Sequence, residues 1–94
     1  MTDLLSLQDY CIFTFISTSH ALKGEKVMKQ AEAHFVMMPT PREVSTSCGL
    51  AIKVNPVEVK KHYQILVEHR VSIEGVFRLT RNGRKTEVQN LEFS

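Results

Sequence analysis

Residues 10–16 read Tyr10-Cys11-Ile12-Phe13-Thr14-Phe15-Ile16 and are apolar at nearly every position. Their β-branched and aromatic side chains favour a strand. An unbroken apolar run is typical of a strand that is buried on both faces at the centre of a sheet. Cys11 lies inside this run, so it is expected to be a small buried hydrophobic residue.

The residues that follow this strand predict a helix and then two more strands. Ser17-Thr18-Ser19 offers several possible helix N-caps, and the helix is expected over residues 20–31. Its apolar face has helical spacing and consists of Ala21, Gly24, Val27, Met28 and Ala31. Gly24 is interpreted as a point of close packing on the sheet. Strands are expected at 34–38 and at 50–54, with Pro39 ending the first of them.

A second helix is marked by the strongest local signal in the chain, Asn55-Pro56-Val57-Glu58. This order places a capping residue, a proline and a glutamate where a capping box needs them. The helix is expected to run to about His69. The side chains expected to face the core are Val59, Tyr63, Leu66 and Val67.

The C-terminal part of the chain predicts a fourth strand and a hairpin. The fourth strand is expected at 72–80, with Ile73, Phe77 and Leu79 on one face. Asn82-Gly83 is a two-residue hairpin signal. It is followed either by a short fifth strand through Val88 and Leu91 or by a loose tail.

This order of elements predicts an α+β fold, a ferredoxin-like βαββαβ sandwich. Its antiparallel sheet would carry two helices on one face, with a possible extra C-terminal hairpin strand. The third strand would lie between the first two and run antiparallel to both. The expected organisation is a polar leader at 1–9, a ferredoxin-like domain at 10–81, and a hairpin or tail at 82–94.

Length and composition limit the classes of function. Ninety-four residues suit one small domain, and the apolar and charged fractions of 43% and 23% are ordinary for a globular protein. A formal charge of +2 gives no argument for a nucleic-acid or membrane partner. The first residues lack the basic and apolar segments of a signal peptide. Two cysteines without such a segment favour a reducing compartment, so the cytoplasm is expected.

The loop at residues 39–51 is the candidate functional segment, because it holds two prolines, a row of hydroxyl residues and Cys48. In the predicted topology, Cys48 lies at the edge of the sheet where the first helix begins, near residues 17–20. A helix N-terminus and nearby cations favour the thiolate form of a cysteine, which is its nucleophilic form. The sequence therefore points to chemistry at Cys48.

Roles can be assigned to the neighbours of Cys48. His20 would donate a hydrogen bond or accept a proton, Arg42 would add positive charge, and Gly49 would let a substrate or partner approach the sulfur. The supporting residues of the loop and helix N-terminus are Ser17, Thr18, Ser19, Pro41, Glu43, Ser45 and Ser47. Hydroxyl groups in the loop, including that of Thr46, either satisfy loop backbone or bind an anion. Val44, Leu50 and the proline loop would form a docking surface.

Two motifs resemble the putative selenium/sulfur carrier protein-like family over residues 10–81. They are Phe15-x-Ser17-Thr18-x-His20-Ala21-Leu22-x-x-Glu25-Lys26 and Pro39-x-Pro41-Arg42-Glu43-Val44-Ser45-x-Ser47-Cys48-Gly49-Leu50-Ala51. The departures are Thr40, where an aliphatic residue is expected, and Thr46, where a serine is expected. Cys11 lies outside the second motif, which argues against a two-cysteine redox mechanism.

The resemblance implies that Cys48 holds sulfur or selenium as a persulfide or selenopersulfide. Such a carrier receives the atom from a cysteine desulfurase-type donor and passes it to an acceptor enzyme. This implies a carrier protein rather than a stand-alone enzyme, with protein partners and no cofactor. Neither sulfur nor selenium is favoured.

Three other classes remain as alternatives. A metal site lacks ligands at suitable spacing beside Cys48, and His62 and His69 are too far apart on the second helix to share one ion. An interaction or regulatory module with an inert Cys48 is the main alternative. Nucleic-acid binding would use Arg78, Arg81, Arg84 and Lys85, but no aromatic residue interleaves with them to stack on bases.

Overall fold

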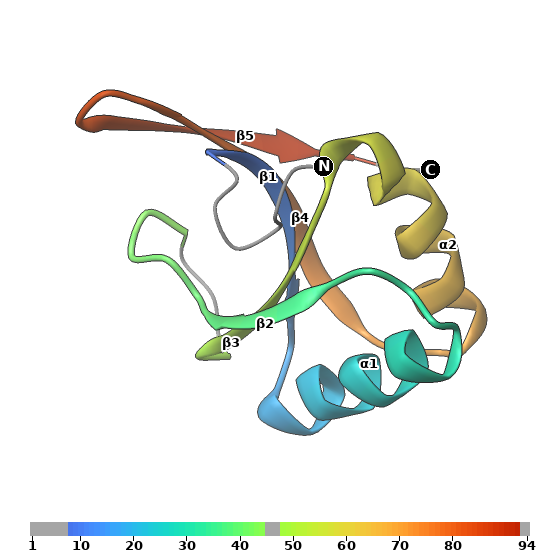
Figure 1. Cartoon of the computed structure of the whole chain (residues 1–94). Helices are drawn as coiled ribbons and strands as arrows, with labels where there is room; N and C mark the ends of the chain where they lie inside the picture. Colours follow the sequence, from blue (N-terminus) through green and yellow to red (C-terminus); the bar gives the residue numbers. More distant parts are fainter. Residues whose placement is uncertain (1–7, 45–47, 93–94) are drawn as a thin grey trace.

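The computed structural model describes residues 8–44 and 48–92 and has an α+β fold. Figure 1 shows a twisted sheet with its helices packed on one side. The elements in chain order are β1 (Asp9–Phe15), α1 (Thr18–Gln30), β2 (Val36–Pro39), β3 (Leu50–Val54), the 3₁₀ turn η2 (Pro56–Glu58), α2 (Val59–Glu68), β4 (Ile73–Asn82) and β5 (Lys85–Leu91). The predicted strands and helices are thus all present within a few residues of the expected bounds.

The sheet has five strands in the order β2-β3-β1-β4-β5. All four neighbouring pairs are antiparallel, and β3 lies between β1 and β2 as the sequence predicts. β1 is the central strand, and its residues from Cys11 to Phe15 are all fully buried. The apolar run at residues 10–16 therefore does form the centre of the sheet.

The C-terminal segment forms a strand rather than a loose tail. β5 pairs with β4 from Val76↔Leu91 to Asn82↔Lys85. The two residues between the paired ends are Gly83 and Arg84, so the turn is one residue later than the Asn82-Gly83 pair suggested. Gly83 has a φ of 64°, a left-handed conformation that glycine adopts without strain.

α1 and the 3₁₀ turn η2 that precedes α2 each begin at a side-chain cap, whereas α2 has no side-chain cap at Glu58. Ser17 caps α1 by accepting a hydrogen bond from the backbone N–H of His20 at 3.3 Å. Asn55 Oδ1 accepts from the Val57 N–H at 3.0 Å, although the first turn after it is 3₁₀ rather than α-helical. The predicted cap at Asn55 is confirmed.

The helices cover one face of the sheet and form the main core with it. Ala21 and Met28 of α1 and Leu66 of α2 belong to the same buried cluster as Phe13 and Ile52 of the sheet. A side-chain carbon at Gly24 would lie 3.1 Å from Phe15 Cε1 and 3.2 Å from Ile52 Cδ1. This confirms close packing of α1 on the sheet at Gly24.

Two predicted core assignments are wrong. Val67 is 48% exposed, whereas His62 is buried, because the inward stripe of α2 is centred on residues 59, 62 and 66. Ile73 packs in the helix-side cluster while Phe77 and Leu79 pack on the opposite face. A change of register between Thr14 and Phe15 reverses the alternation there, since Thr14 pairs with Gly75 but Phe15 pairs with Ile73.

The chain ends lie largely outside the described residues. Of the expected polar leader at 1–9, Gln8 and Asp9 are described. Asp9 begins β1 and forms an ion pair with Arg78 at 2.7 Å. No helix in the described part of the chain is long and apolar enough to cross a membrane.

Candidate functional site

The predicted site residues gather at one edge of the sheet. The pairs Pro39↔Leu50 and Phe15↔Ile73 place the end of β1, the end of β2 and the starts of β3 and β4 at the same edge. The first turn of α1 begins there with Ser17 as its cap. The prediction that the start of β3 lies at the sheet edge where α1 begins is therefore correct, and the start of β4 lies at the same edge.

Cys48 lies directly beside the start of α1. Its Sγ is 3.9 Å from Thr18 Oγ1, and the thiol is placed to donate a hydrogen bond to that oxygen. The backbone N–H of Leu50 donates to the same sulfur at 3.4 Å. The residue is 2% exposed and belongs to the helix-side core cluster. Cys48 is thus close to helix N-terminal groups but covered by protein.

The backbone around Cys48 is fixed by Thr40. The Thr40 hydroxyl donates to the Cys48 carbonyl at 3.0 Å, and the Thr40 N–H donates to the Gly49 carbonyl at 2.9 Å. The expected aliphatic residue at this position would make the second bond but not the first. The threonine at position 40, in place of the expected aliphatic residue, therefore adds a side-chain hydrogen bond that holds the backbone of Cys48.

The hydrogen bond of the His20 ring joins it to Ser72, in the segment before β4. Its Nδ1 accepts from the backbone N–H of Ser72 at 3.1 Å, so this nitrogen is an acceptor and a neutral ring carries its proton on Nε2. Thr18 faces the start of β3, whereas His20 faces the segment before β4. The first turn of α1 therefore bridges two strand starts, and the proposed action of His20 on Cys48 remains a prediction.

The proline loop places its charges at the surface. The Val44 N–H donates to the Pro41 carbonyl at 3.0 Å, which closes a turn with Arg42 and Glu43 exposed at its centre. Val44 itself is 6% exposed and packs with Ile12 on the second face of the sheet. The prediction that Val44 forms a docking surface is wrong, because its side chain serves the core. Ser45, Thr46 and Ser47 lie outside the described residues.

Gly49 is exposed and has open space beside it. A side-chain carbon added there would meet no other atom within 4 Å. The glycine is therefore not required by packing among the described residues. The sequence predicts open space at Gly49, through which a substrate or partner would approach the sulfur of Cys48.

The second cysteine has a different environment. Cys11 is fully buried in β1, and burial raises the pKa of its thiol to about 11. Cys11 and Cys48 are both reduced thiols. Because the thiolate is the reactive form, Cys11 is suited to packing rather than to chemistry.

Comparison with known protein families gives a match that covers most of the chain. The family model described as Putative Se/S carrier protein-like matches residues 10–78, which span the site from β1 through α1 and Cys48 to β4. The chain belongs to this family. No curated protein matches it, and no solved structure matches it.

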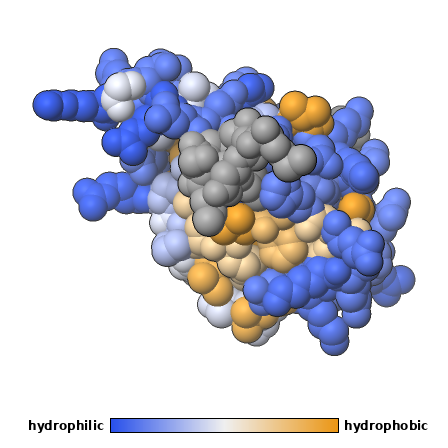
Figure 2. Space-filling model, viewed as in Figure 1, coloured by the Kyte–Doolittle hydropathy of each residue, from blue (hydrophilic) through white to orange (hydrophobic). Residues whose placement is uncertain are grey.

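Exposed apolar side chains flank the thiol of this Se/S carrier-like protein. Ile16 and Leu22, on either side of the first turn of α1, are 51% and 52% exposed. Leu22 is four residues after Thr18, so the two lie on the same side of the helix. Figure 2 also shows an apolar strip on the surface where Figure 1 places β2. Contiguous apolar surface of this kind is typical of protein docking sites.

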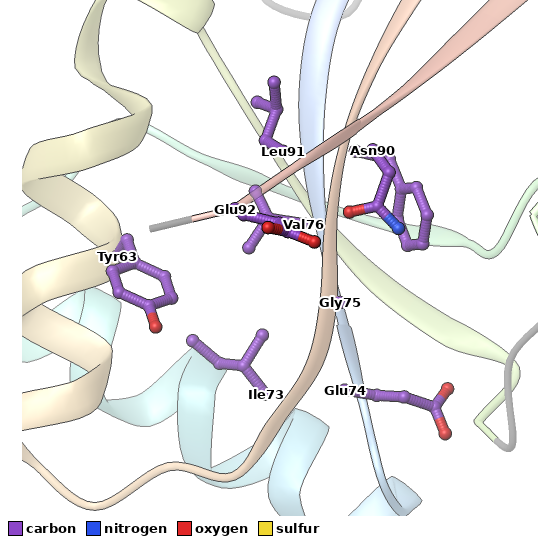
Figure 3. A pocket seen from close by; sticks show the side chains of 9 residues that line it. Tyr63, Ile73, Glu74, Gly75, Val76, Asn90, Leu91 and Glu92 are labelled. Atoms are coloured by element: carbon purple, nitrogen blue, oxygen red, sulfur yellow. The ribbon is translucent and has the colours of Figure 1, made fainter. Parts of the chain in front are cut away.

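A separate cavity of about 620 Å³ opens between α2, β4 and β5. Figure 3 shows Tyr63 on one side of it and Ile73, Val76 and Leu91 around it. Glu74, Gly75, Phe77, Asn90 and Glu92 complete the lining. Sequence reasoning missed this cavity because it depends on how three consecutive elements, α2, β4 and β5, pack against one another. None of the predicted site residues lines it.

The metal-site and nucleic-acid alternatives can be compared with the residues that the structure describes. The described residues contain no group of three or more metal-binding side chains. Of the basic residues on the hairpin, Arg78 binds the Asp9 carboxylate through Nε at 2.9 Å and Nη2 at 2.7 Å. Arg81 Nε donates to the Gly83 carbonyl at 3.2 Å. Two members of the basic cluster therefore have intramolecular partners.

Proposed function

We propose that this protein is a sulfur or selenium carrier in which Cys48 holds the transferred atom as a persulfide or selenopersulfide. The observation that carries the proposal is the position of the Cys48 sulfur between the Thr18 hydroxyl and the Leu50 N–H. This arrangement of the Cys48 sulfur occurs in a chain that belongs to the Se/S carrier-like family. We place the carrier in the cytoplasm, where a reduced thiol persists. Its first four strands are assigned to a ferredoxin-like arrangement, with β5 as an addition.

The transfer needs no oxidant. The Cys48 thiolate attacks the outer sulfur of a donor persulfide, R–S–SH, so that a new S–S bond forms on Cys48 and the donor S–S bond breaks. The donor leaves as a thiolate and takes up a proton from solvent. In the second step an acceptor thiolate attacks the outer sulfur, and Cys48 leaves as a thiolate.

The donor is proposed to be a cysteine desulfurase-type protein, and the acceptor an enzyme that uses the sulfur. Since Cys48 is 2% exposed, transfer requires the sulfur to become accessible when a partner binds. Ile16 and Leu22 provide exposed apolar surface for the donor beside the site. Arg42 and Glu43 orient the partner, and Arg42 adds positive charge near the anionic sulfur. The neutral His20 ring offers its Nε2–H as a hydrogen-bond donor.

The test is sulfur loading followed by intact-mass measurement. The protein is incubated with a cysteine desulfurase and cysteine, and separately with selenocysteine as the substrate. The wild type should gain the mass of one sulfur or one selenium atom, and a thiol reductant should remove it. Cys48→Ser should gain nothing, whereas Cys11→Ala should load normally. No gain by the wild type, or an equal gain by Cys48→Ser, would sink the proposal.

An interaction module with an inert cysteine is the second candidate. It is favoured by the membership of Cys48 in the core cluster. In that case the wild type would not load, and Cys48→Ser would retain any partner that the wild type retains in a pull-down. Loading that depends on Cys48 would exclude this alternative.

A further inference from the structure

We propose that the Thr18 hydroxyl and the Leu50 backbone N–H form a two-donor site that holds the Cys48 sulfur as an anion. Thr18 is then a positioning residue for the transfer chemistry. The inference rests on the proposed function, because it takes Cys48 as the reacting group. In this proposal the Thr18 hydroxyl donates a hydrogen bond to the sulfur, which is a role separate from that of the helix N-terminus as a whole.

The two donors come from elements that are far apart along the chain. Thr18 is the first residue of α1, and its backbone is fixed by the Ser17 cap. Leu50 is the first residue of β3 and is paired with Pro39 of β2. The Thr40 hydroxyl bond to the Cys48 carbonyl fixes the backbone that carries the sulfur. The sulfur therefore lies between two anchored groups, at 3.9 Å and 3.4 Å.

Ionisation of the thiol changes the direction of one hydrogen bond. In the thiol form, the Cys48 S–H donates to Thr18 Oγ1 while the Leu50 N–H donates to the sulfur. A thiolate has no proton to donate, so the Thr18 hydroxyl turns and donates to it. Within the described part of the chain, the anion thus gains the Thr18 hydroxyl as a donor in addition to the Leu50 N–H. Hydrogen bonds to the charged form favour that form, and such bonds are stronger than neutral ones.

The neighbouring hydroxyl groups have other partners. The Ser17 hydroxyl accepts from the His20 N–H, and the Thr40 hydroxyl donates to the Cys48 carbonyl. The Thr14 hydroxyl donates to the Gly75 carbonyl. Among the described hydroxyl residues of this edge, Thr18 is the one whose side chain is directed to the sulfur. Thr18 is also exposed, so an incoming group meets it before it meets Cys48.

The experiment compares alkylation of Cys48 by iodoacetamide across pH in a set of variants. Thr18→Val keeps the shape of the side chain and removes the hydroxyl, and Thr18→Ser keeps the hydroxyl. Thr86→Val is the matched control, because it removes a threonine hydroxyl from β5, an edge strand that does not pair with β3. Thr18→Val should alkylate about tenfold more slowly near neutral pH, with its rate curve moved to higher pH, since a charge-assisted hydrogen bond contributes about one decade or more. Thr18→Ser should follow the wild type.

Thermal unfolding verifies that each variant is folded, and Thr18→Ala replaces Thr18→Val if the valine variant is not. An unchanged rate curve in the hydroxyl-free variant, or an equal change in Thr86→Val, would overturn the proposal. Sulfur loading of the wild type is measured in parallel. A rate curve that depends on Thr18 in a protein that never loads would reject the carrier function alone. Normal loading without any effect of Thr18 would reject this inference alone.

Discussion

Thr18 Oγ1 lies 3.9 Å from Cys48 Sγ, although the two residues are 30 positions apart in the chain. Residue 18 opens a helix and residue 48 immediately precedes a strand, and the antiparallel register of β1 and β3 brings them together. The thiol is thereby placed at the start of α1, where unpaired N–H groups favour negative charge. This contact is the structural basis for treating Cys48, and not Cys11, as the reactive cysteine.

The first prediction concerns the selectivity of alkylation. In the folded protein near neutral pH, a small alkylating reagent should modify one cysteine per chain, and peptide mapping should locate it at Cys48. Cys11 is fully buried and its pKa is raised to about 11, so it should react after unfolding in denaturant. Modification of Cys11 at the same rate as Cys48 in the native state would contradict this assignment.

The second prediction concerns the docking of the donor protein. Leu22→Glu places a charge on exposed apolar surface beside the site and should slow sulfur loading by a desulfurase several-fold. Val57→Glu is the matched control, because Val57 is 90% exposed and lies in η2, beyond the opposite end of β3. Both variants should keep wild-type stability, since exposed substitutions usually change it little. Equal loading rates for the two variants would remove Leu22 from the docking surface.

The third prediction compares two glycines. Gly24→Ala should lower the free energy of unfolding by about 1 kcal/mol, because overpacking costs about 1–3 kcal/mol and exceeds the roughly 1 kcal/mol gained in helix propensity. The atoms that the new carbon would meet belong to Phe15 and Ile52, which are both fully buried. Urea denaturation measures the difference. A more stable Gly24→Ala variant would mean that these neighbours can move.

Gly49→Ala is the counterpart to this substitution. The new carbon has open space, so stability should be unchanged or higher by about 0.5 kcal/mol through the unfolded state. Loading of Cys48 should nevertheless slow, because the methyl group occupies the space beside the sulfur-bearing residue. Loading at the wild-type rate would show that donors reach Cys48 from another direction.

The fourth prediction concerns stability at acidic pH. His62 is 2% exposed, its Nδ1 has no hydrogen-bond partner among the described residues, and burial lowers its pKa below the ordinary value of 6.5. The folded state therefore keeps the ring neutral while the unfolded state protonates it. The stabilising contribution is present above pH 6.5 and is lost as pH falls through the pKa of the folded state. Nearby charges act in both directions, since Glu58 raises this pKa whereas Lys61 and His34 lower it.

Urea midpoints at neutral pH and at about pH 5 test this prediction. The wild type should lose more stability on acidification than His62→Leu, which has no titrating ring. At neutral pH the variant should lie within about 1 kcal/mol of the wild type, because it also removes an unpartnered buried nitrogen. His69→Gln is the control on an exposed histidine at the C-terminal end of the same helix. Parallel pH profiles for the wild type and His62→Leu would contradict the role of His62.

Local patterns predicted the elements well where one physical cause dominates. The apolar run in β1, the helical spacing of α1 and the cap at Asn55 all act over a few residues. The connection order then predicted that β3 lies between β1 and β2. From that order followed the position of Cys48 beside the start of α1, which is the central feature of the candidate site.

The predictions of which side chains face the core were wrong where tertiary contacts, rather than spacing along one element, set the direction of a side chain. The register change beside Phe15 reversed the face of Ile73, and the packing of α2 selected His62 instead of Val67 for the interior. Val44 was directed inward because the second face of the sheet also needs apolar cover. None of these choices is encoded in the spacing of residues along one element.

The sequence by itself determined the strands and helices, their order and the identity of the thiol, because these follow from residue type and short-range periodicity. Only the tertiary structure decided which groups meet that thiol. The side chains of Thr18 and His20 start from the same helical turn, yet one reaches Cys48 and the other reaches the Ser72 N–H. Side chains that are two positions apart on a helix point in different directions, and the strand on each side decides what each one contacts.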